Sequence, residues 1–271
     1  MIDIEEQNSL RAQYNPDGSQ LRRAQLRMVD LLKFIDNICR EHNLRYWIAY
    51  GTLIGAMRHG GFIPWDDDAD ICMPREDALK LKKIMANKVW DGHIVLQTPD
   101  TDPKFNTPSW YVVRDLKSEY IQDSWAHKRL KYRGLQVDIF IVEENLNPTL
   151  SNISRLMGLT GILWPSNNVF HFGCFRPLLR FNYNLLEKAI LPLFRLFHTN
   201  DNTIRAGLGT SFKLEYPRDA VYPLSRICFE GVELNAPGDP EKILTIRYGD
   251  WDKVPTVEER VTHDADFKFF E

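Results

Sequence analysis

Hydrophobic positions recur along the chain with two different spacings, and these spacings predict both helices and strands. Apolar residues three and four apart are typical of amphipathic helices, which we expect at residues 20–42 and 75–90. Short runs rich in aromatic and branched side chains predict strands at residues 46–50, 69–73, 93–97, 110–114, 119–122, 135–142 and 229–234. A last helix is expected from Pro240 to Tyr248, because proline fits a first helical turn. The mixture predicts an α+β fold, with a mixed β-sheet core flanked by helices.

Two segments depart from this pattern. Residues 1–18 are polar and contain the turn sequence Asn-Pro-Asp-Gly, so we expect a loose N-terminal arm. Residues 151–200 are rich in Leu, Phe, Trp and Ile and predict a helical elaboration, whose longest helix spans residues 176–197. We interpret it as a helical layer on the sheet; the alternative is a surface whose basic and aromatic side chains contact anionic lipid. A short helix is also predicted at residues 202–208.

Composition narrows the class of protein. A chain of 271 residues that is 44% hydrophobic and 26% charged predicts a folded single domain over residues 1–271. The net charge of −3 gives no sign of a nucleic-acid-binding surface. The four cysteines lack metal-binding spacing, no signal peptide precedes them, and no apolar run is long enough to span a bilayer. We therefore expect a cytoplasmic protein with reduced thiols.

The stretch from residue 46 to residue 74, YWIAYGTLIGAMRHGGFIPWDDDADICMP, combines a predicted phosphate-binding turn with a cluster of carboxylates. Gly51 and Thr52 separate a strand from the helix that follows, and a helix N-terminus attracts phosphate through its unpaired amides and partial positive charge. Side chains at i and i+2 of a strand share a face, so Asp68 and Asp70 can converge on one cation. Oxygen ligands suit Mg²⁺, which shares its coordination with substrate phosphates. The combination indicates nucleotide-dependent transfer chemistry.

Four further residues have both a functional and a structural interpretation. Asp138 lies in the apolar strand LQVDIFIV, where a carboxylate is unfavourable unless it is paired or binds metal; an exposed strand end or a salt bridge is the alternative. Arg114 can grip a donor phosphate with its planar guanidinium or pair with a neighbouring carboxylate. Arg58 and His59 are expected near the donor's pyrophosphate or head group, with capping of a helix C-terminus as the alternative.

The segment GTLIGAMRHGGFIPWDDDAD resembles the signature of LicD-type transferases, which move phosphocholine from CDP-choline onto bacterial surface glycans; fukutin-related proteins share the same core. The family belongs to the nucleotidyltransferase superfamily, whose pattern is Gly-Ser/Thr, then Asp-x-Asp, then a third carboxylate on a later strand. The resemblance implies a nucleotidyltransferase-type sheet with Asp68, Asp70 and Asp138 as catalytic metal ligands, Asp138 serving as ligand or general base. Residues 248–263 also resemble the family's tail, although the usual proline pair is replaced by Val-Pro.

The aspartates of the cluster are expected to have different roles. Asp67 is predicted to face away from Asp68 and Asp70 and to be structural, and Asp66 is predicted to orient them. The spacing is also similar to a calcium loop, but the positions that need glycine and a bidentate glutamate hold other residues. A purely structural role for all four is disfavoured, because carboxylates so close together repel one another without a cation.

The resemblance implies transfer of phosphocholine, or a related phospho-alcohol such as ribitol phosphate, from a CDP-activated donor to a cell-surface glycan such as lipopolysaccharide, teichoic acid or capsule. The expected cofactor is Mg²⁺, with Mn²⁺ as a substitute. The acceptor is expected to be lipid-linked, which implies peripheral contact with the cytoplasmic face of the inner membrane. Transfer of a nucleoside monophosphate to a small molecule or sugar is the alternative reaction, and a non-catalytic scaffold is the alternative class. Contacts to the donor are predicted for Gly51, Thr52, Arg58, His59 and Arg114.

Overall fold

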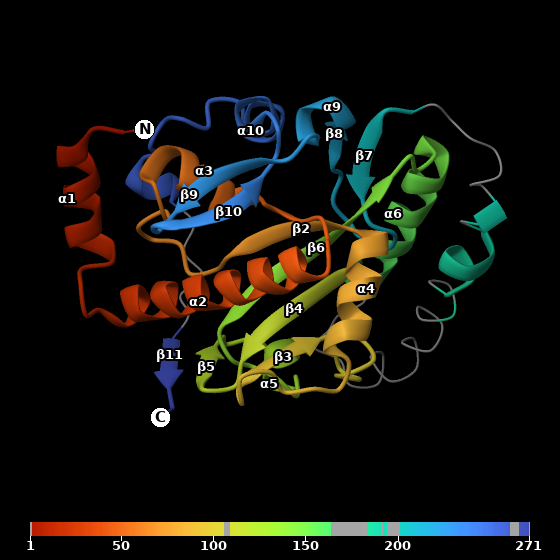
Figure 1. Ribbon diagram of the computed structural model, residues 1–271, viewed down its shortest axis with the longest axis horizontal. Coiled ribbons are helices and arrows are strands. Elements are labelled where there is room, and N and C mark those ends of the chain that lie inside the picture. Colours follow the sequence, from red (N-terminus) through yellow and green to blue (C-terminus); the bar gives the residue numbers. More distant parts are fainter. Residues whose placement is uncertain are drawn as a thin grey trace.

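A mixed sheet forms the centre of the protein (Figure 1). The computed structural model describes residues 2–105, 109–163, 181, 184–190, 192–193, 201–260 and 266–270. Within them, seven strands form one sheet with the path β1-β2-β6-β4-β3, while β7 pairs with β6 and β8 with β7. β2 and β6 are parallel, and the other pairs are antiparallel. The strands are β1 Trp47–Ile48, β2 Asp70–Pro74, β3 Ile94–Gln97, β4 Trp110–Asp115, β6 Gln136–Glu144, β7 Thr203–Ala206 and β8 Glu215–Pro217.

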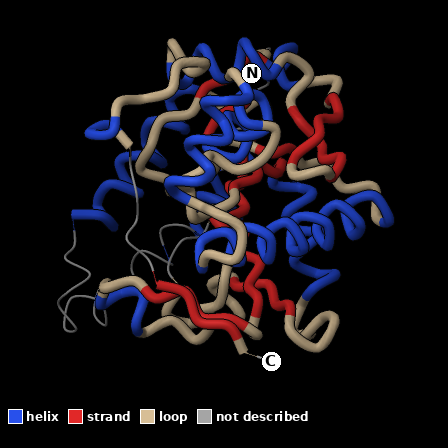
Figure 2. Tube along the Cα trace, turned by 90° about the vertical axis from the view of Figure 1, so that its left-hand side faces the viewer, coloured by secondary structure: helices blue, strands red, loops and turns tan. Residues whose placement is uncertain are grey.

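Two smaller strand pairs flank this sheet. β9 (Ser225–Phe229) and β10 (Val232–Ala236) form an antiparallel hairpin that replaces the single strand predicted at residues 229–234. β5 (Ser118–Ile121) pairs with β11 (Asp266–Phe269), so that the C-terminal end of the chain lies beside the middle of the sequence (Figure 2).

Two of the predicted amphipathic helices pack on the sheet. The helix predicted at residues 20–42 is α2 (Gln20–Glu41), which buries an apolar stripe that includes Met28, Leu32 and Ile35. The helix predicted at residues 75–90 is shorter, α4 (Arg75–Met85). α10 (Pro240–Tyr248) begins and ends where predicted, and Gly249 caps its C-terminal end. Short helices complete the described chain: α5 Trp125–Lys128, η1 Leu186–Ile190, α9 Arg218–Val221 and η2 Val257–Glu259.

The helix after the glycine-threonine turn starts earlier than predicted. α3 (Tyr50–His59) follows the two-residue strand β1 directly, so Gly51 and Thr52 lie in its first turn instead of preceding it. The helix ends at Gly60, whose φ of 69° is left-handed, as the double glycine predicted. The first turn of α3 therefore lies at the N-terminal end of β2, where the carboxylates are.

The predicted loose N-terminal arm is wrong. Residues of this segment form α1 (Ile4–Tyr14), with two glutamates in its first turn, where negative charge favours a helix. The segment also contacts the body of the protein: the Ile2 N–H donates to Arg58 O at 3.2 Å, and the Tyr14 ring packs edge-on against Trp65. These contacts supply the stability that a short polar helix lacks by itself.

The helix predicted at residues 202–208 is also wrong. Those residues form β7, in which Ala206 pairs with Val142 of β6 and Ile204 is fully buried. A partner strand distant in sequence therefore overrides the local preference.

The predicted helical elaboration can be described only in part. α6 (Pro148–Leu163) forms its beginning and exposes Ile153 and Leu156. Most of residues 164–200, including most of the helix predicted at 176–197, lies outside the described residues. Among the helices that the structure describes, none is both long and apolar enough to cross a membrane.

Candidate active site

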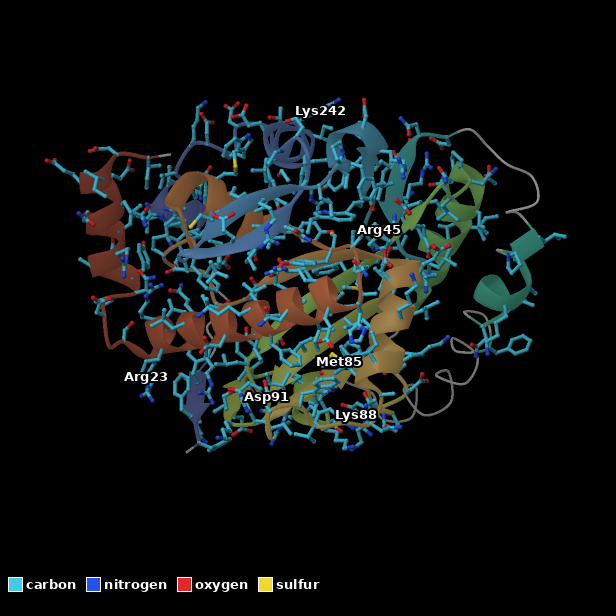
Figure 3. The ribbon with its side chains drawn as sticks, in the orientation of Figure 1. Arg23, Arg45, Met85, Lys88, Asp91 and Lys242 are labelled. Carbon is cyan, nitrogen blue, oxygen red and sulfur yellow. The ribbon has the colours of Figure 1, made fainter. Side chains whose placement is uncertain are left out.

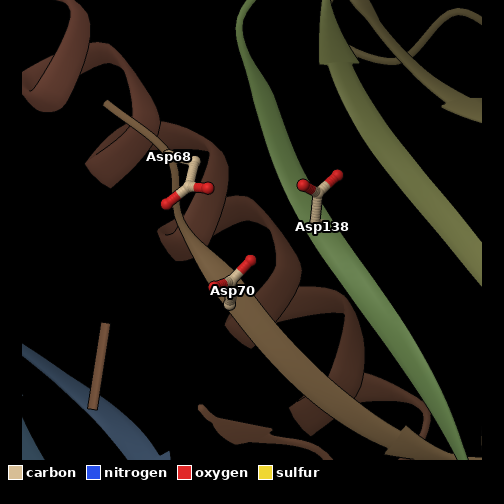
Figure 4. Close-up of side chains that lie close together, drawn as sticks. All are labelled: Asp68, Asp70 and Asp138. Atoms are coloured by element: carbon tan, nitrogen blue, oxygen red, sulfur yellow. The ribbon is translucent and has the colours of Figure 1, made fainter. Parts of the chain in front are cut away.

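Three carboxylates meet at the N-terminal end of β2 and in the middle of the sheet. One oxygen from each of Asp68, Asp70 and Asp138 lies within 4.8 Å of the others (Figure 4). Asp70 of β2 and Asp138 of β6 are register partners across the parallel pair, and the Asp138 N–H donates to Ala69 O at 2.8 Å. Asp68 comes from the segment before β2, so it reaches the group from a loop. The structure thus brings together the three predicted ligands.

The electrostatics of this group favour a bound cation. Asp70 and Asp138 are only 8% and 4% exposed. Burial, and then the charges of Asp68 and Asp138, raise the pKa of Asp70 well above its usual value. Burial also raises the pKa of Asp138 to about 7, against the opposing effect of Arg114. Three crowded carboxylates are unfavourable in the ionised form without a positive charge between them.

The donor atoms also fit Mg²⁺ or Mn²⁺. All three side chains offer carboxylate oxygens, the ligand type that these ions prefer. Asp138 Oδ1 is buried and has no hydrogen-bond partner among the described residues, so a lone pair is left for a ligand. The indole N–H of Trp110 is near enough to lower the pKa of Asp138. It makes no hydrogen bond of normal geometry within the described chain, so it does not satisfy Asp138 Oδ1.

Arg114 acts on this group indirectly. It is buried on β4, where Nε donates to Gln97 Oε1 at 2.8 Å and Nη1 donates to Gly134 O at 3.0 Å and to Gln136 Oε1. Gln136 Nε2 in turn donates to Asp138 Oδ2 at 3.0 Å. Arg114 therefore orients Asp138 through Gln136. Sequence reasoning missed Gln136, whose signal was its position two residues before Asp138 on the same strand face.

The first turn of α3 lies against the carboxylates. The Asp70 N–H donates to Thr52 Oγ1 at 2.7 Å, which ties the start of β2 to the helix. A Cβ added at Gly51 would lie 2.6 Å from Asp66 Oδ2, so only glycine lets the Asp66 carboxylate come this close to the helix N-terminus. Tyr50, at the start of α3, has a left-handed φ of 50°, a costly conformation for an aromatic residue. Strain and close approach thus coincide where a phosphate is expected.

Asp67 is turned to a different partner from that of its neighbours. Its side chain is buried, and Oδ2 accepts a hydrogen bond from the Tyr120 hydroxyl at 3.1 Å. This contact ties the aspartate loop to β5.

Arg58 and His59 lie at the other end of α3 from Thr52. Arg58 is buried, and Nη1 donates to Trp251 O at 2.9 Å and to Lys253 O at 2.7 Å. His59 Nδ1 lies 2.6 Å from Gln7 Oε1, and burial followed by the Arg58 charge lowers the His59 pKa to about 3. The structure does not bring these two residues to the carboxylates. They hold the tail and α1 instead.

Comparison with known proteins points to the same region of the chain as the geometry. Residues 43–152 match the family model described as LicD/FKTN/FKRP, nucleotidyltransferase domain. The chain is 24% identical to the lipopolysaccharide cholinephosphotransferase LicD of Haemophilus influenzae, over 90% of this chain and 95% of that protein. It is 40% identical to human ribitol 5-phosphate transferase FKRP over 45 residues, 17% of this chain and 9% of that protein. It is also 43% identical to the uncharacterized protein RP689 of Rickettsia prowazekii, over 22% of this chain and 23% of that protein.

The family match includes the whole carboxylate group and the first turn of α3, which the geometry had already brought together. Residues 43–152 therefore match the LicD/FKTN/FKRP family, and over most of its length the chain is similar to a LicD cholinephosphotransferase.

Proposed function

We propose that this protein transfers phosphocholine, or a related phospho-alcohol such as ribitol phosphate, from a CDP-activated donor to a hydroxyl of a cell-surface glycan. The observation that carries the proposal is the convergence of Asp68, Asp70 and Asp138 beside the first turn of α3. The name of the LicD relative, a lipopolysaccharide cholinephosphotransferase, supports phosphocholine as the group and lipopolysaccharide as an acceptor. The name of the FKRP relative supports a wider range of phospho-alcohols.

The carboxylates would hold Mg²⁺ or Mn²⁺ through Asp68, Asp70 and Asp138. Such a cation, when bound, neutralises charge on the donor's phosphates. In the transfer, the acceptor oxygen forms a bond to the phosphorus of the phospho-alcohol, the bond from that phosphorus to the CMP oxygen breaks, and the hydroxyl proton leaves the acceptor.

The chain's own groups position the donor and receive the proton. The amides at the start of α3 would face the phosphates, and Gly51 leaves room beside them for the Asp66 carboxylate. Thr52 Oγ1 fixes the backbone of Asp70. If Asp138 serves as general base instead of as a cation ligand, it accepts the acceptor's proton at Oδ1, the oxygen that Gln136 leaves without a hydrogen bond.

Transfer of a nucleoside monophosphate is the second candidate, because the matching family model is described as a nucleotidyltransferase domain. Both reactions need negative charge stabilised around a phosphate that is attacked. They differ in the leaving group, which is CMP in the first and pyrophosphate in the second.

The test is to supply the purified protein with Mg²⁺ and either CDP-choline plus a glycan acceptor or CTP plus phosphocholine. We expect CMP from the first mixture, in amounts that depend on the acceptor, together with an acceptor heavier by one phosphocholine. CDP-ribitol in place of CDP-choline tests the other phospho-alcohol. Pyrophosphate from the second mixture alone would favour nucleotidyl transfer, and no product from any mixture would contradict both reactions.

For the setting, we propose that the protein works in the cytoplasm at the inner face of the inner membrane, on a lipid-linked acceptor. The exposed apolar side chains of α6 support contact with such an acceptor. Nucleic acid is not a proposed partner.

A further inference from the structure

Arg247 is an exposed arginine in the last turn of α10 whose charge has no carboxylate partner among the described residues. Its Nη1 donates to the carbonyl of Lys213 at 3.3 Å, a neutral group. Arg58 and Arg114, the arginines that the sequence put forward for the donor, are instead buried and held by carbonyl or amide oxygens of the protein. Arg247 thus keeps a guanidinium that can still bind an anion.

Two aromatic rings hold this guanidinium in place. Its central carbon lies 5.6 Å from the ring centroid of Tyr50 and 5.9 Å from that of Tyr248. Both distances are within the range of cation–π attraction. Tyr50 is the first residue of α3 and immediately precedes Gly51 and Thr52, so the guanidinium lies beside a side chain of the first turn of that helix. A cation restrained in this way loses less conformational entropy when it binds.

Arg247 and the carboxylates border one site, because both lie at the first turn of α3. Arg247 stacks on the ring of Tyr50, the first residue of that helix, and the Asp70 N–H donates to Thr52 Oγ1 in the same turn at 2.7 Å. The pKa of Tyr50 is consistent with this geometry: burial raises it most, and among the smaller effects Asp70 raises it and Arg247 lowers it.

We propose that Arg247 binds a phosphate of the nucleotide donor, opposite the carboxylate group and next to the amides of α3. The assignment rests on the proposed function for the identity of the donor, but its chemistry requires only a diphosphate. A guanidinium offers planar, fork-like donors that match phosphate oxygens, and it stays charged throughout the working pH range. Arg247 makes or breaks no covalent bond in the transfer; it positions the diphosphate and offsets its charge.

The structural alternative is that Arg247 only stabilises α10. A cation in the last turn of a helix interacts favourably with the helix dipole, and this effect needs no ligand. The two roles differ in what they predict for ligand binding by a folded variant.

The experiment measures binding of CDP-choline, inorganic pyrophosphate and cytidine by calorimetry with excess Mg²⁺, using the full chain. The variants are Arg247→Gln and Arg247→Lys, and Lys242→Gln is the control. Lys242 lies on the same helix, at the top of Figure 3, and its Nζ is 4.0 Å from Asp219. Circular dichroism and thermal unfolding establish that each variant is folded.

We expect Arg247→Gln to weaken binding of CDP-choline and pyrophosphate by about 10- to 100-fold, the loss of one charged hydrogen-bonding partner. Cytidine binding should not change, because it has no phosphate. Arg247→Lys should bind with intermediate strength, since lysine keeps the charge without the fork. Lys242→Gln should bind all three ligands like the unaltered protein.

Two outcomes overturn the proposal. A folded Arg247→Gln variant that binds CDP-choline and pyrophosphate with unchanged affinity leaves only the helix-stabilising role. Binding of neither ligand by the unaltered protein also rejects it. If pyrophosphate binding depends on Arg247 while CDP-choline releases no CMP, the Arg247 site stands and the proposed phosphocholine transfer fails.

Discussion

Asp70 and Asp138 face each other as register partners across the parallel strands β2 and β6. This register brings two buried carboxylates from distant parts of the sequence into one group that Asp68 completes. A shift of one residue in the pairing would turn the Asp138 side chain to the opposite face of the sheet. Features that hold the start of β2 in place should therefore affect the site as strongly as the carboxylates themselves.

Thr52 is one such feature, because its hydroxyl accepts the backbone N–H of Asp70. Thr52→Val keeps the shape of the side chain and leaves that buried N–H without an acceptor, which costs about 1–3 kcal/mol. We expect this loss in the free energy of unfolding measured with urea, together with slower CMP release. Thr52→Ser, which keeps the hydroxyl, is the control. An unchanged urea midpoint in the valine variant would show that the hydrogen bond does not hold β2.

Gly51 and Gly55 lie in the same helix but should respond differently to alanine. A Cβ at Gly51 meets the carboxylate end of Asp66, which can turn away, so we expect a folded Gly51→Ala variant with reduced turnover. A Cβ at Gly55 would lie 2.3 Å from the backbone oxygen of Gly61, which cannot move alone. We therefore expect Gly55→Ala to lower stability by about 1–3 kcal/mol. Thermal unfolding and CMP release of both variants test this contrast, and a Gly55→Ala variant as stable as the unaltered protein would refute it.

The pKa of Asp138 predicts how stability depends on pH when metal is removed by a chelator. The pKa is about 7 in the folded protein, whereas an unfolded aspartate has a pKa of about 3.9. Between these values the folded state keeps a proton that the unfolded state has released. The free energy of unfolding should therefore fall as pH rises from about 4 to about 7. Asp70, whose pKa is shifted in the same direction, should add to this fall.

The measurement is urea unfolding at several pH values, for the unaltered protein and for Asp138→Asn. The variant should show a shallower decrease, because its amide does not titrate. Added Mg²⁺ should flatten the decrease in the unaltered protein, since a bound cation favours the ionised carboxylates. Identical pH dependence of the two proteins in chelator would show that Asp138 is not the group that titrates.

Local signals drew attention to the carboxylates, although the choice of metal binding for Asp138 came from the resemblance to the LicD-type pattern of a third carboxylate on a later strand. A charged residue inside the apolar run of β6 is visible without a structure, and so are four aspartates in one short stretch. The predicted position of Asp68 on the same strand face as Asp70 was less accurate. β2 begins only at Asp70, so Asp68 reaches the group from a loop and not by strand alternation.

The arginines could not be assigned in this way, because their partners are distant in sequence. Arg58 is satisfied by the carbonyls of Trp251 and Lys253, and Arg114 by oxygens that include that of Gln97. The same limit explains β7, whose strand conformation depends on pairing with β6. A local pattern can show a carboxylate in an apolar run. The hydrogen-bond partners of a long side chain such as arginine depend on segments that only folding brings together.

The carboxylates carry the central claim, and steady-state CMP release from CDP-choline by purified, folded variants tests it most directly. Asp68→Asn, Asp70→Asn and Asp138→Asn keep side-chain shape and remove charge, so each should lower turnover by about a hundredfold or more. Asp67→Asn is the matched control, since its amide oxygen can still accept from Tyr120, and it should lose much less activity. The account predicts this division among neighbouring aspartates and loss of activity in excess chelator. Near-normal turnover by folded Asp70→Asn, or full activity in chelator, would contradict it.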